Sequence, residues 1–377
     1  MVDSISLSPE EFKRFLNSGE IDFIFDLRNT DEFENWKIEG PRAIETLNIP
    51  QPDFIGEEEQ YQDRFPKNKR IITICAHGDS SRYTAKWLQE RGYYAQSLEG
   101  GMDAWSEFYQ TVRVCDKPVI YQINRVARGC LGYIIAANGE AVVIDAARHL
   151  ENFTSILEQD DLRLRHVFDT HIHADHISGG RMLSELTGAE YYINSADTDG
   201  AAYKITPMKD DDGIFKLGEH SLKVIDSPGH TPGSTSFLLD EKILFTGDTI
   251  MKSAIGRPDL GGKADAWSLM LYNTLFERYA ALDDGVLIFP SHAVPLFDED
   301  ESGAVCTTLG NSRRNLDLFR LPDKEKFKDL VKNSLPINPE RYQDIRKVNL
   351  GLLNAAEDRM KELEIGKNLC GMAKADL

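Results

Sequence analysis

Seven residues of metal-binding type stand directly after predicted strands in the second half of the chain. They are His171, His173, Asp175, His176, His230, Asp248 and His292. Four of them lie within residues 170–176, and side chains so close in sequence reach one ion only where a turn spreads them, as the end of a strand does. Unrelated histidines would rarely recur at successive strand ends. The spacing therefore predicts a metal site built from imidazoles and carboxylates.

Four predicted strands position these residues, each a short run of apolar and β-branched residues. They cover residues 167–169, 222–225, 243–245 and 286–289. Helical spacing is expected near residues 151–158, 177–186 and 266–282. Strand-like runs start near residue 119, after a connector at 105–116. We therefore predict a second domain of residues 113–377 with a mostly helical C-terminal extension.

Cys75 is a further residue whose position favours chemistry. It follows the apolar run 71–74 and opens the loop 76–81, which leads into a predicted helix. Backbone N–H groups at the start of a helix stabilise a thiolate or a persulfide anion. The alternative is a buried cysteine that only packs as a small hydrophobic residue.

The segments around Cys75 predict an α/β domain. Strand-like and helix-like segments alternate over about the first 110 residues, which is typical of a parallel sheet with helices on both faces. We therefore predict a first domain of residues 1–112. Two domains also agree with the length of 377 residues, because one hydrophobic core rarely organises so long a chain.

The first domain resembles the rhodanese (sulfurtransferase) family. The resemblance rests on Asp26-Leu27-Arg28 after a strand, on residues 47–50, on the Cys75 loop and on residues 98–105. It implies that Cys75 is catalytic and carries the transferred sulfur as a persulfide. Ser80 stands where the family commonly has an arginine, which leaves the sulfur donor open.

The second domain resembles the metallo-β-lactamase superfamily over about residues 117–300. The resemblance implies an αββα sandwich with a metal site at one edge of the packed sheets. Two readings of the ligands are open. A dinuclear zinc hydrolase resembling glyoxalase II would bind one Zn with His171, His173, His230 and Asp248, and a second Zn with Asp175, His176, Asp248 and His292.

The other reading is a persulfide dioxygenase with one Fe(II) per chain. The iron would be held by His171, His230 and Asp248, which leaves three positions for the substrate sulfur and O2. The remaining candidates would orient these ligands through hydrogen bonds, namely His173, Asp175, His176 and His292.

Segments other than those that carry the metal ligands favour the dioxygenase reading. Residues 255–260 resemble the Gly-Arg-x-Asp segment of persulfide dioxygenases, and Leu271-Tyr272 matches a tyrosine position beside their iron. The C-terminal region, including Pro336 and Asn349, resembles the same family. The resemblance implies that Arg257 and Tyr272 bind the substrate. The fusion to a rhodanese domain also favours the dioxygenase reading, because both domains would then handle sulfane sulfur.

Composition and charge exclude other classes of protein. The chain has 43 Lys and Arg against 62 Asp and Glu, a formal net charge of −19, so we expect no nucleic-acid partner. Its apolar runs are too short for a bilayer and its first residues lack a signal-peptide pattern, so we expect neither membrane insertion nor secretion. Five scattered cysteines without a CxxC motif favour a reducing, cytoplasmic location. We also expect a homo-oligomer.

Together these features predict an enzyme. It would oxidise a low-molecular-weight persulfide, such as glutathione persulfide, to sulfite with Fe(II) and O2, and would transfer sulfane sulfur through Cys75. Its partners would be the small persulfide or thiol and O2. The alternatives are the dinuclear zinc thioester hydrolase and a non-catalytic sulfur carrier or sensor.

Overall fold

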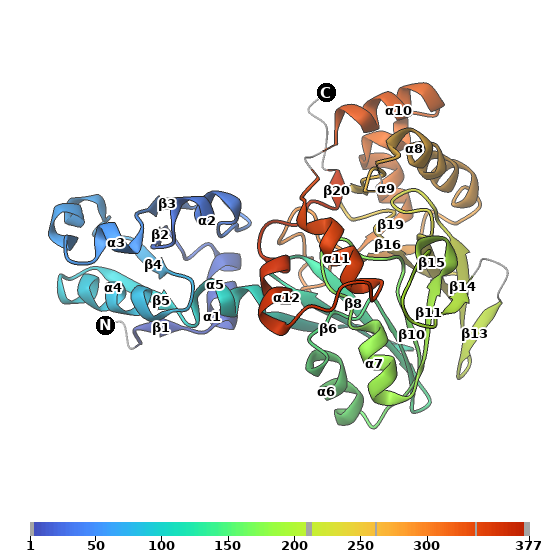
Figure 1. The fold of residues 1–377 in the computed structure, drawn as a ribbon, viewed down its shortest axis with the longest axis horizontal. Coiled ribbons are helices and arrows are strands. Elements are labelled where there is room, and N and C mark those ends of the chain that lie inside the picture. Colours follow the sequence, from blue (N-terminus) through green and yellow to red (C-terminus); the bar gives the residue numbers. More distant parts are fainter. Residues whose placement is uncertain (1–3, 209–212, 261, 336–337, 373–377) are drawn as a thin grey trace. The chain divides into compact units, whose positions relative to one another are not determined.

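The chain folds into two compact units (Figure 1). The computed structural model describes residues 4–208, 213–260, 262–335 and 338–372. The first unit comprises the described chain up to Tyr109, together with Arg125–Arg128 and Ile365–Lys367, and the second comprises the rest. Each unit has a hydrophobic core of its own.

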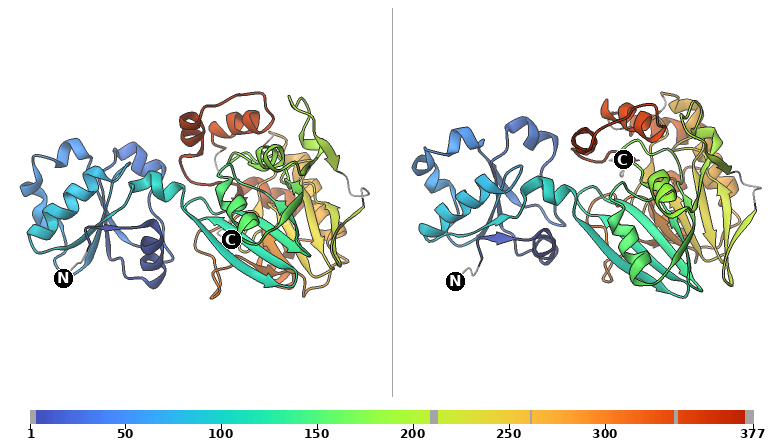
Figure 2. Two further views of the ribbon diagram at one scale, coloured as in Figure 1. Left: turned by 90° about the horizontal axis from the view of Figure 1, so that it is seen from below. Right: turned by 60° about the horizontal axis from the view of Figure 1, so that its bottom comes forward.

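The first unit is built on a five-stranded parallel sheet with the order β1-β5-β4-β2-β3. Its strands are β1 (Ser6–Leu7), β2 (Phe23–Asp26), β3 (Glu45–Asn48), β4 (Arg70–Ile74) and β5 (Tyr94–Leu98). Its helices are α1 (Pro9–Ser18), α2 (Thr30–Asn35), α3 (Gln51–Phe54), α4 (Asp79–Glu90) and α5 (Gly101–Ser106). Helices lie on both faces of the sheet (Figure 2), as the alternating sequence pattern predicts.

The second unit contains two larger sheets. One has seven strands in the order β12-β11-β10-β9-β8-β7-β6, and the other has six in the order β13-β14-β15-β16-β18-β19. The strands of the first are β6 (Tyr109–Asp116), β7 (Val119–Arg125), β8 (Cys130–Ala137), β9 (Glu140–Ile144), β10 (Arg163–Phe168), β11 (Glu190–Asn194) and β12 (Thr206–Met208). Those of the second are β13 (Ile214–Leu217), β14 (His220–Asp226), β15 (Thr235–Leu239), β16 (Ile243–Gly247), β18 (Leu287–Pro290) and β19 (Thr307–Thr308).

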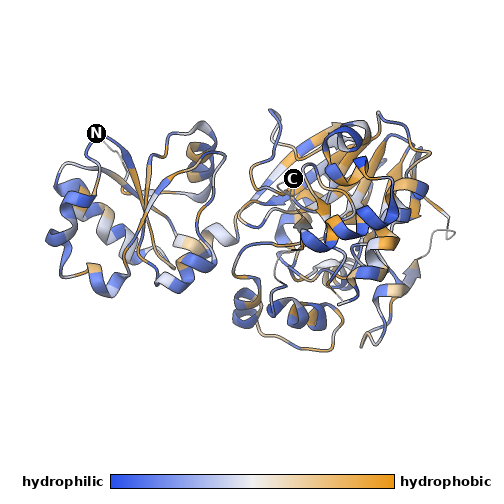
Figure 3. Cartoon of the chain, turned by 90° about the horizontal axis from the view of Figure 1, so that it is seen from above, coloured by the Kyte–Doolittle hydropathy of each residue, from blue (hydrophilic) through white to orange (hydrophobic). Residues whose placement is uncertain are grey.

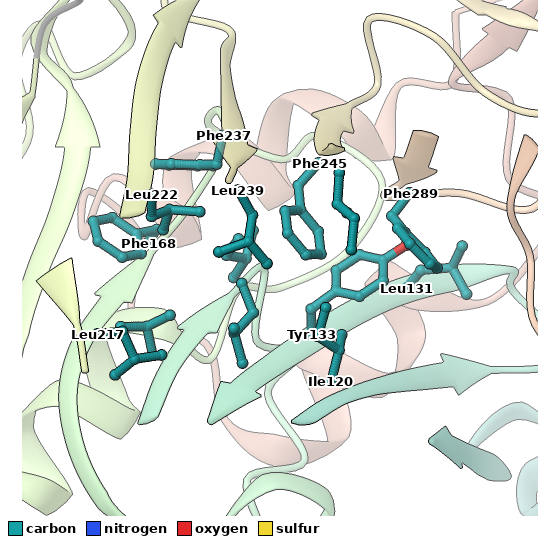
Figure 4. Close-up of a cluster of buried hydrophobic side chains, with 14 of the residues drawn as sticks. Ile120, Leu131, Tyr133, Phe168, Leu217, Leu222, Phe237, Leu239, Phe245 and Phe289 are labelled. Carbon is teal, nitrogen blue, oxygen red and sulfur yellow. The ribbon is translucent and has the colours of Figure 1, made fainter. Parts of the chain in front are cut away.

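The two sheets of the second unit pack face to face over aromatic and aliphatic side chains (Figure 4). Phe168 of β10 meets Phe237 of β15 with ring centroids 4.9 Å apart. Tyr133 of β8 meets Phe245 of β16 at the same distance. Central strands such as β15 and β16 are buried along their whole length and carry the hydrophobic runs 237–239 and 243–245. Hydrophobic residues gather in the sheets (Figure 3).

Helices cover the outer faces of this pair of sheets. They are α6 (Glu151–Gln159) and α7 (Gly180–Thr187) beside the first sheet, and α8 (Ala264–Asn273), α9 (Leu309–Asn315) and α10 (Lys324–Asn333) beside the second. For example, Leu244 of β16 and Ile288 of β18 belong to one buried cluster with Leu271 of α8 and Phe327 of α10. The layers therefore follow the order helix, sheet, sheet, helix, which confirms the predicted αββα sandwich.

The C-terminal region returns to the second unit's sheet edge. It contains α11 (Arg341–Asn349), α12 (Glu357–Glu364) and the short strand β20 (Gly371–Met372). Strand β20 pairs antiparallel with β17 (Ile255–Gly256), so residues 368–372 lie beside the segment that carries Arg257. Pro336 lies outside the described residues. Within the described chain, every helix is too short or too polar to cross a bilayer.

Candidate metal centre and sulfur-carrier loop

Four loops bring the predicted metal-binding residues together at one edge of the two sheets. One loop follows β10 and carries His171 to His176, and the others hold His230 before β15, Asp248 after β16 and His292 after β18. Strands β16 and β18 are parallel neighbours, so their carboxyl ends meet at the same edge. The backbone N–H of Thr235 donates to the carbonyl of Thr170 at 2.8 Å and ties the first loop to β15.

His171, His230 and Asp248 form a buried triad. Asp248 Oδ2 lies 3.5 Å from His230 Nε2 and 3.9 Å from His171 Nε2. All three residues are almost completely shielded from solvent. Gly256 of β17 is needed beside them, because a Cβ there would lie 2.1 Å from the Asp248 carbonyl oxygen and 3.0 Å from His230 Nδ1.

Hydrogen bonds to Nδ1 fix the two imidazole rings of this triad, so their Nε2 atoms face one another. His230 Nδ1 donates to the carbonyl of Arg257 at 2.8 Å. The hydroxyl of Thr170 donates to Asp145, so it accepts from His171 Nδ1 at 2.9 Å. Burial lowers the pKa of both His171 and His230, which keeps them neutral with a lone pair on Nε2.

The triad fits a metal ion. Among the described residues, no hydrogen-bond partner reaches His171 Nε2, His230 Nε2 or Asp248 Oδ2, although all three atoms are buried. Buried polar atoms without partners are rare because desolvation costs free energy. Two neutral imidazole nitrogens and one carboxylate oxygen facing one point are ligands for a divalent cation.

His173 lies outside this triad although its ring is close to His171. Its Nε2 is 3.2 Å from Asp145 Oδ1, and the two residues form a buried group with Asp169. Asp145 also accepts from the backbone N–H of Thr170 at 2.7 Å. Asp145 therefore fixes the start of residues 170–176, called the ligand loop below. In the sequence, only its position at the end of β9 indicates this role.

A second cluster consists of Asp175, His176, His292 and Cys130. His292 Nε2 lies 2.8 Å from Asp175 Oδ2, and His292 Nδ1 lies 2.5 Å from Asp248 Oδ1. Burial acts to lower the pKa of His292, but the Asp248 and Asp175 carboxylates outweigh it and raise this pKa well above its ordinary value. His292 thus connects the second cluster to the triad.

Cys130 is a member of this cluster that sequence reasoning missed. Its sulfur lies 3.6 Å from Asp175 Oδ2. Burial acts to raise the pKa of the Cys130 thiol, but the neighbouring His176 outweighs it and lowers this pKa to about 6. In the sequence, Cys130 is only the first residue of an apolar strand, and nothing there shows that this strand passes His292.

Residues of the C-terminal region hold the ligand loop. Asn349 donates from Nδ2 to the carbonyls of His173 and His176, both at 2.9 Å. Asn368 donates from Nδ2 to Asp175 Oδ2 at 2.8 Å. Asn349 lies in the region whose resemblance to persulfide dioxygenases was noted above, whereas Asn368 has no signal in the sequence.

The two predicted substrate-binding residues have partners of their own. Arg257 is fully buried, and its guanidinium donates to Asp259 at 2.7 and 2.8 Å. The hydroxyl of Tyr272 donates to the carbonyl of Pro322 at 2.5 Å. Its ring stacks on Phe276 with centroids 4.6 Å apart. Arg257 thus lies beside the triad, whereas the contacts of Tyr272 lie toward Pro322 and α10, where its ring also meets that of Phe327.

Cys75 lies in the first unit between β4 and α4, as predicted. Its sulfur accepts from the backbone N–H of Gly78 at 3.1 Å and of Ser81 at 3.4 Å, and it contacts Ser81 Oγ at 3.3 Å. Such donors stabilise negative charge on sulfur. Ser80 is turned to Gln51, with Ser80 Oγ donating to Gln51 Oε1 at 2.6 Å.

Comparison with known families agrees with the fold of both units. Residues 8–108 match the rhodanese-like domain, and residues 125–292 match the metallo-beta-lactamase superfamily. A crystal structure of a metallo-beta-lactamase from Staphylococcus aureus subsp. aureus COL is 28% identical, with a TM-score of 0.56, and covers 63% of this chain and 74% of that one. Fold and site thus define a metallo-β-lactamase-fold enzyme preceded by a rhodanese-like domain.

Two further relatives narrow this class. The mitochondrial persulfide dioxygenase ETHE1 of Bos taurus is 32% identical over 201 residues, which are 52% of this chain and 73% of the relative. The crystal structure of ETHE1 from Myxococcus xanthus is 25% identical, with a TM-score of 0.51, and covers 65% of this chain and 100% of that one. The chain belongs to the persulfide dioxygenase family.

Proposed function

We propose that this chain oxidises a low-molecular-weight persulfide, such as glutathione persulfide, to sulfite with one Fe(II) per chain and O2. The observation that carries the proposal is the triad of His171, His230 and Asp248, with three buried ligand atoms that lack hydrogen-bond partners among the described residues. Two imidazoles and one carboxylate are the ligand set of mononuclear non-haem iron oxygenases. Iron held there supplies open positions for the substrate sulfur and O2.

The overall reaction balances without a further reductant. One persulfide, one O2 and one water give one thiol, one sulfite and two protons. The reacting sulfur arrives as an anion, so the chain needs no general base to activate it. What the chain must supply is a buried, correctly oriented ligand set.

Hydrogen bonds to those ligand atoms that do not face the centre of the triad supply that orientation. The Thr170 hydroxyl and the Arg257 carbonyl each accept from the Nδ1 of one ligand histidine, so both Nε2 atoms face the centre of the triad. His292 holds the carboxylate of Asp248. In this proposal His173, Asp175, His176 and His292 do not bind the iron but orient its ligands.

His173 is the residue on which the single-iron reading and the dinuclear zinc reading differ. That hydrolase needs His173 as a ligand beside His171 and His230. Its Nε2 faces Asp145 at 3.2 Å, whereas its Nδ1 is buried without a hydrogen-bond partner among the described residues, so the metal content of His173→Ala distinguishes the two readings.

Arg257 and Tyr272 remain the proposed substrate-binding residues. The contacts of Arg257 also support a positioning role for this residue. Its side chain pairs with Asp259, and its backbone carbonyl fixes the His230 ring. To bind a carboxylate of the carrier thiol, the buried Arg257 guanidinium would exchange its contact with Asp259 for that carboxylate.

For the first domain, residues 1–112, we propose sulfane-sulfur transfer through Cys75. The backbone N–H groups of Gly78 and Ser81 support an anionic persulfide on its sulfur. The transfer would either make the persulfide that residues 113–377 oxidise or pass sulfur to sulfite and form thiosulfate.

We also propose that the protein acts in the cytoplasm as a homo-oligomer. In the described chain no disulfide joins Cys75, Cys115, Cys130, Cys306 or Cys370, which favours a reducing compartment. Light scattering on the purified chain measures the oligomeric state.

Oxygen consumption by the iron-loaded chain tests the function. With glutathione persulfide we expect O2 uptake and sulfite formation in equal amounts, in proportion to the iron bound. A chain that takes up two Zn, hydrolyses thioesters and consumes no O2 would be the hydrolase. A chain that carries persulfide on Cys75 but catalyses neither reaction would be a sulfur carrier or sensor.

A further inference from the structure

A cavity outside the metal centre lies between α7, β11 and the C-terminal region of the second unit. Its volume is about 300 Å³, and small-molecule sites typically have volumes of about 300–1,000 Å³. Most of the residues that line it are apolar or aromatic, and one of them, Arg181, is charged. We propose that this cavity binds a small amphipathic carboxylate, a molecule with an apolar or aromatic body and one carboxylate group.

The apolar walls of the cavity favour the body of such a ligand. Met182 of α7 and Met360 of α12 line the cavity, together with Val348 of α11 and Leu353. Methionine side chains are flexible and polarisable, so they adapt to the shape of a ligand and contact aromatic rings favourably. Water is held weakly against apolar walls, and an apolar group that displaces such water gains affinity.

Two tyrosine rings favour a flat or aromatic group in particular. Tyr191 and Tyr203 both line the cavity, with ring centroids 6.4 Å apart. The Tyr191 hydroxyl donates to Asp169 Oδ2 at 2.8 Å, and the Tyr203 hydroxyl donates to the Asn349 carbonyl at 2.7 Å. Because the protein engages both hydroxyls, the rings contribute mainly carbon surface to a bound ligand.

Arg181 supplies the positive charge that a carboxylate requires. Its guanidinium carbon lies 5.2 Å from the centroid of the Tyr203 ring, so the charge lies over one wall of the cavity. Its Nη1 donates to Glu185 Oε1 at 2.8 Å, but the two side chains are 42% and 63% exposed. Ion pairs this exposed are weak, and a guanidinium has five N–H donors. A ligand carboxylate can therefore share Arg181 with Glu185 or replace it.

The cavity shares part of its wall with the ligand loop of the metal centre. Ile177 and Ser178 directly follow this loop and line the cavity. Asn349 lines it too, accepting from the Ser178 N–H and donating to the His176 carbonyl, both at 2.9 Å. A ligand that packs against these residues restricts the motion of the loop. The site is therefore regulatory, because a bound carboxylate and a metal ion in the triad order the same loop and each raises the affinity for the other.

Isothermal titration calorimetry of the unmodified full-length chain with 3-phenylpropionate tests the binding. We expect saturable binding at one site per chain. The uncharged 3-phenylpropionamide should bind about 10-fold more weakly, because charge-assisted hydrogen bonds are stronger than neutral ones. The variant Arg181→Gln should lose this preference for the acid. The matched control is Arg359→Gln on α12, which should bind as the unmodified chain does, because Arg359 pairs with Glu362 and Asp344 and does not line the cavity.

A cavity-filling variant distinguishes a ligand inside the cavity from one on the surface beside Arg181. Ala355 lines the cavity from a loop and is half-buried, so Ala355→Phe can fill the space without changing a helix or strand. This variant should abolish the binding of both compounds. Hydrogen exchange of residues 171–178 tests the coupling to the metal centre, and we expect slower exchange when 3-phenylpropionate is bound.

Three results would overturn the proposed site. They are no binding of 3-phenylpropionate, equal affinity of the unmodified chain for the acid and the amide, and binding that a folded Ala355→Phe variant leaves unchanged. If Ala355→Phe fails to fold, the comparison of Arg181→Gln with Arg359→Gln decides. Binding without slower exchange would refute the regulatory role. The site does not depend on the proposed function, since its test requires neither a metal ion nor a persulfide.

Discussion

The His292 ring shows how individual residues set the chemistry of this centre. Its two nitrogens contact two different carboxylates, Asp248 at 2.5 Å and Asp175 at 2.8 Å. Each contact restricts the rotation of the ring and of the carboxylate that it meets. Asp248 is therefore held with Oδ2 toward His171 and His230, which no property of Asp248 alone would ensure.

Replacing Asp248 by Ala should abolish iron binding and O2 consumption. The two remaining imidazoles cannot hold Fe(II) in a facial site. Sulfur transfer through Cys75 should persist, because Cys75 belongs to a separate folded unit. Metal analysis, an oxygen electrode and a sulfurtransferase assay on one preparation give all three values. Iron retained at the level of the unmodified chain would refute this ligand assignment.

The variant His173→Ala separates the two readings of the ligand set. With a single iron, it removes only a partner of Asp145, so iron should be largely retained while activity falls by about 10–100-fold. With two zinc ions, it removes a direct ligand and one ion should leave. The ratio of activity to bound metal is the measurement. Activity and metal lost in equal proportion would favour the hydrolase.

At the scale of elements, α5 fixes the Cys75 loop. The N–H groups of Met102 and Asp103 donate to the carbonyls of Cys75 and Ala76 at 2.9 and 3.1 Å. Gly101 allows this approach, because it has a φ of +61° and a Cβ there would lie 2.3 Å from the Cys75 carbonyl oxygen. The helix and the loop can thus meet only if this residue is glycine.

Replacing Gly101 by Ala should therefore both destabilise the first unit and slow sulfur transfer. We expect the free energy of unfolding to fall by about 3 kcal/mol or more, since backbone strain of about 1–2 kcal/mol adds to the steric clash. The control is Gly92→Ala, where φ is +82° but nothing lies within 4 Å of the added Cβ, so only the strain applies. Urea unfolding measures both. Equal losses in the two variants would show that the contact with Cys75 does not matter.

Much of the element order can be predicted from the sequence. Buried strands such as β4 and β16 consist mainly of apolar and β-branched residues, which is a clear strand pattern. The sequence predicts a connector at residues 105–116, and this is wrong from Tyr109 onward, because Tyr109–Asp116 forms the edge strand β6. Its residues are half-exposed and largely polar, which masks the strand. Helix α7 also starts at Gly180, later than predicted, since Gly179 packs against the Ala147 carbonyl in a loop.

The candidate site also contains some residues that the sequence predicts and others that it does not. His171, His230 and Asp248 can be named from the sequence because residue type and strand-end position coincide. Cys130, Asp145 and Asn368 cannot, since each has ordinary surroundings in the sequence and gains its role from a contact with a distant segment. Only tertiary structure supplies those contacts.

For the whole molecule, the two units predict separable activities. The variant Cys75→Ser should abolish sulfur transfer but leave O2 consumption with a preformed persulfide nearly unchanged, because the triad draws every ligand from the second unit. Mass spectrometry should find the added sulfur of a sulfane donor on Cys75 in the unmodified chain. Loss of O2 consumption in Cys75→Ser would mean that sulfur passes directly from Cys75 to the metal centre.

The pairing of β20 with β17 also has a consequence for biosynthesis. Asn368 and its neighbours close the wall beside Asp175 and Arg257, yet they lie later in the sequence than every metal-binding residue. A ribosome therefore completes all the ligands before the segment that encloses them. Until residues 368–372 pair with β17, the wall beside Asp175 and Arg257 is incomplete, which leaves the ligands more accessible to a metal ion in the nascent chain.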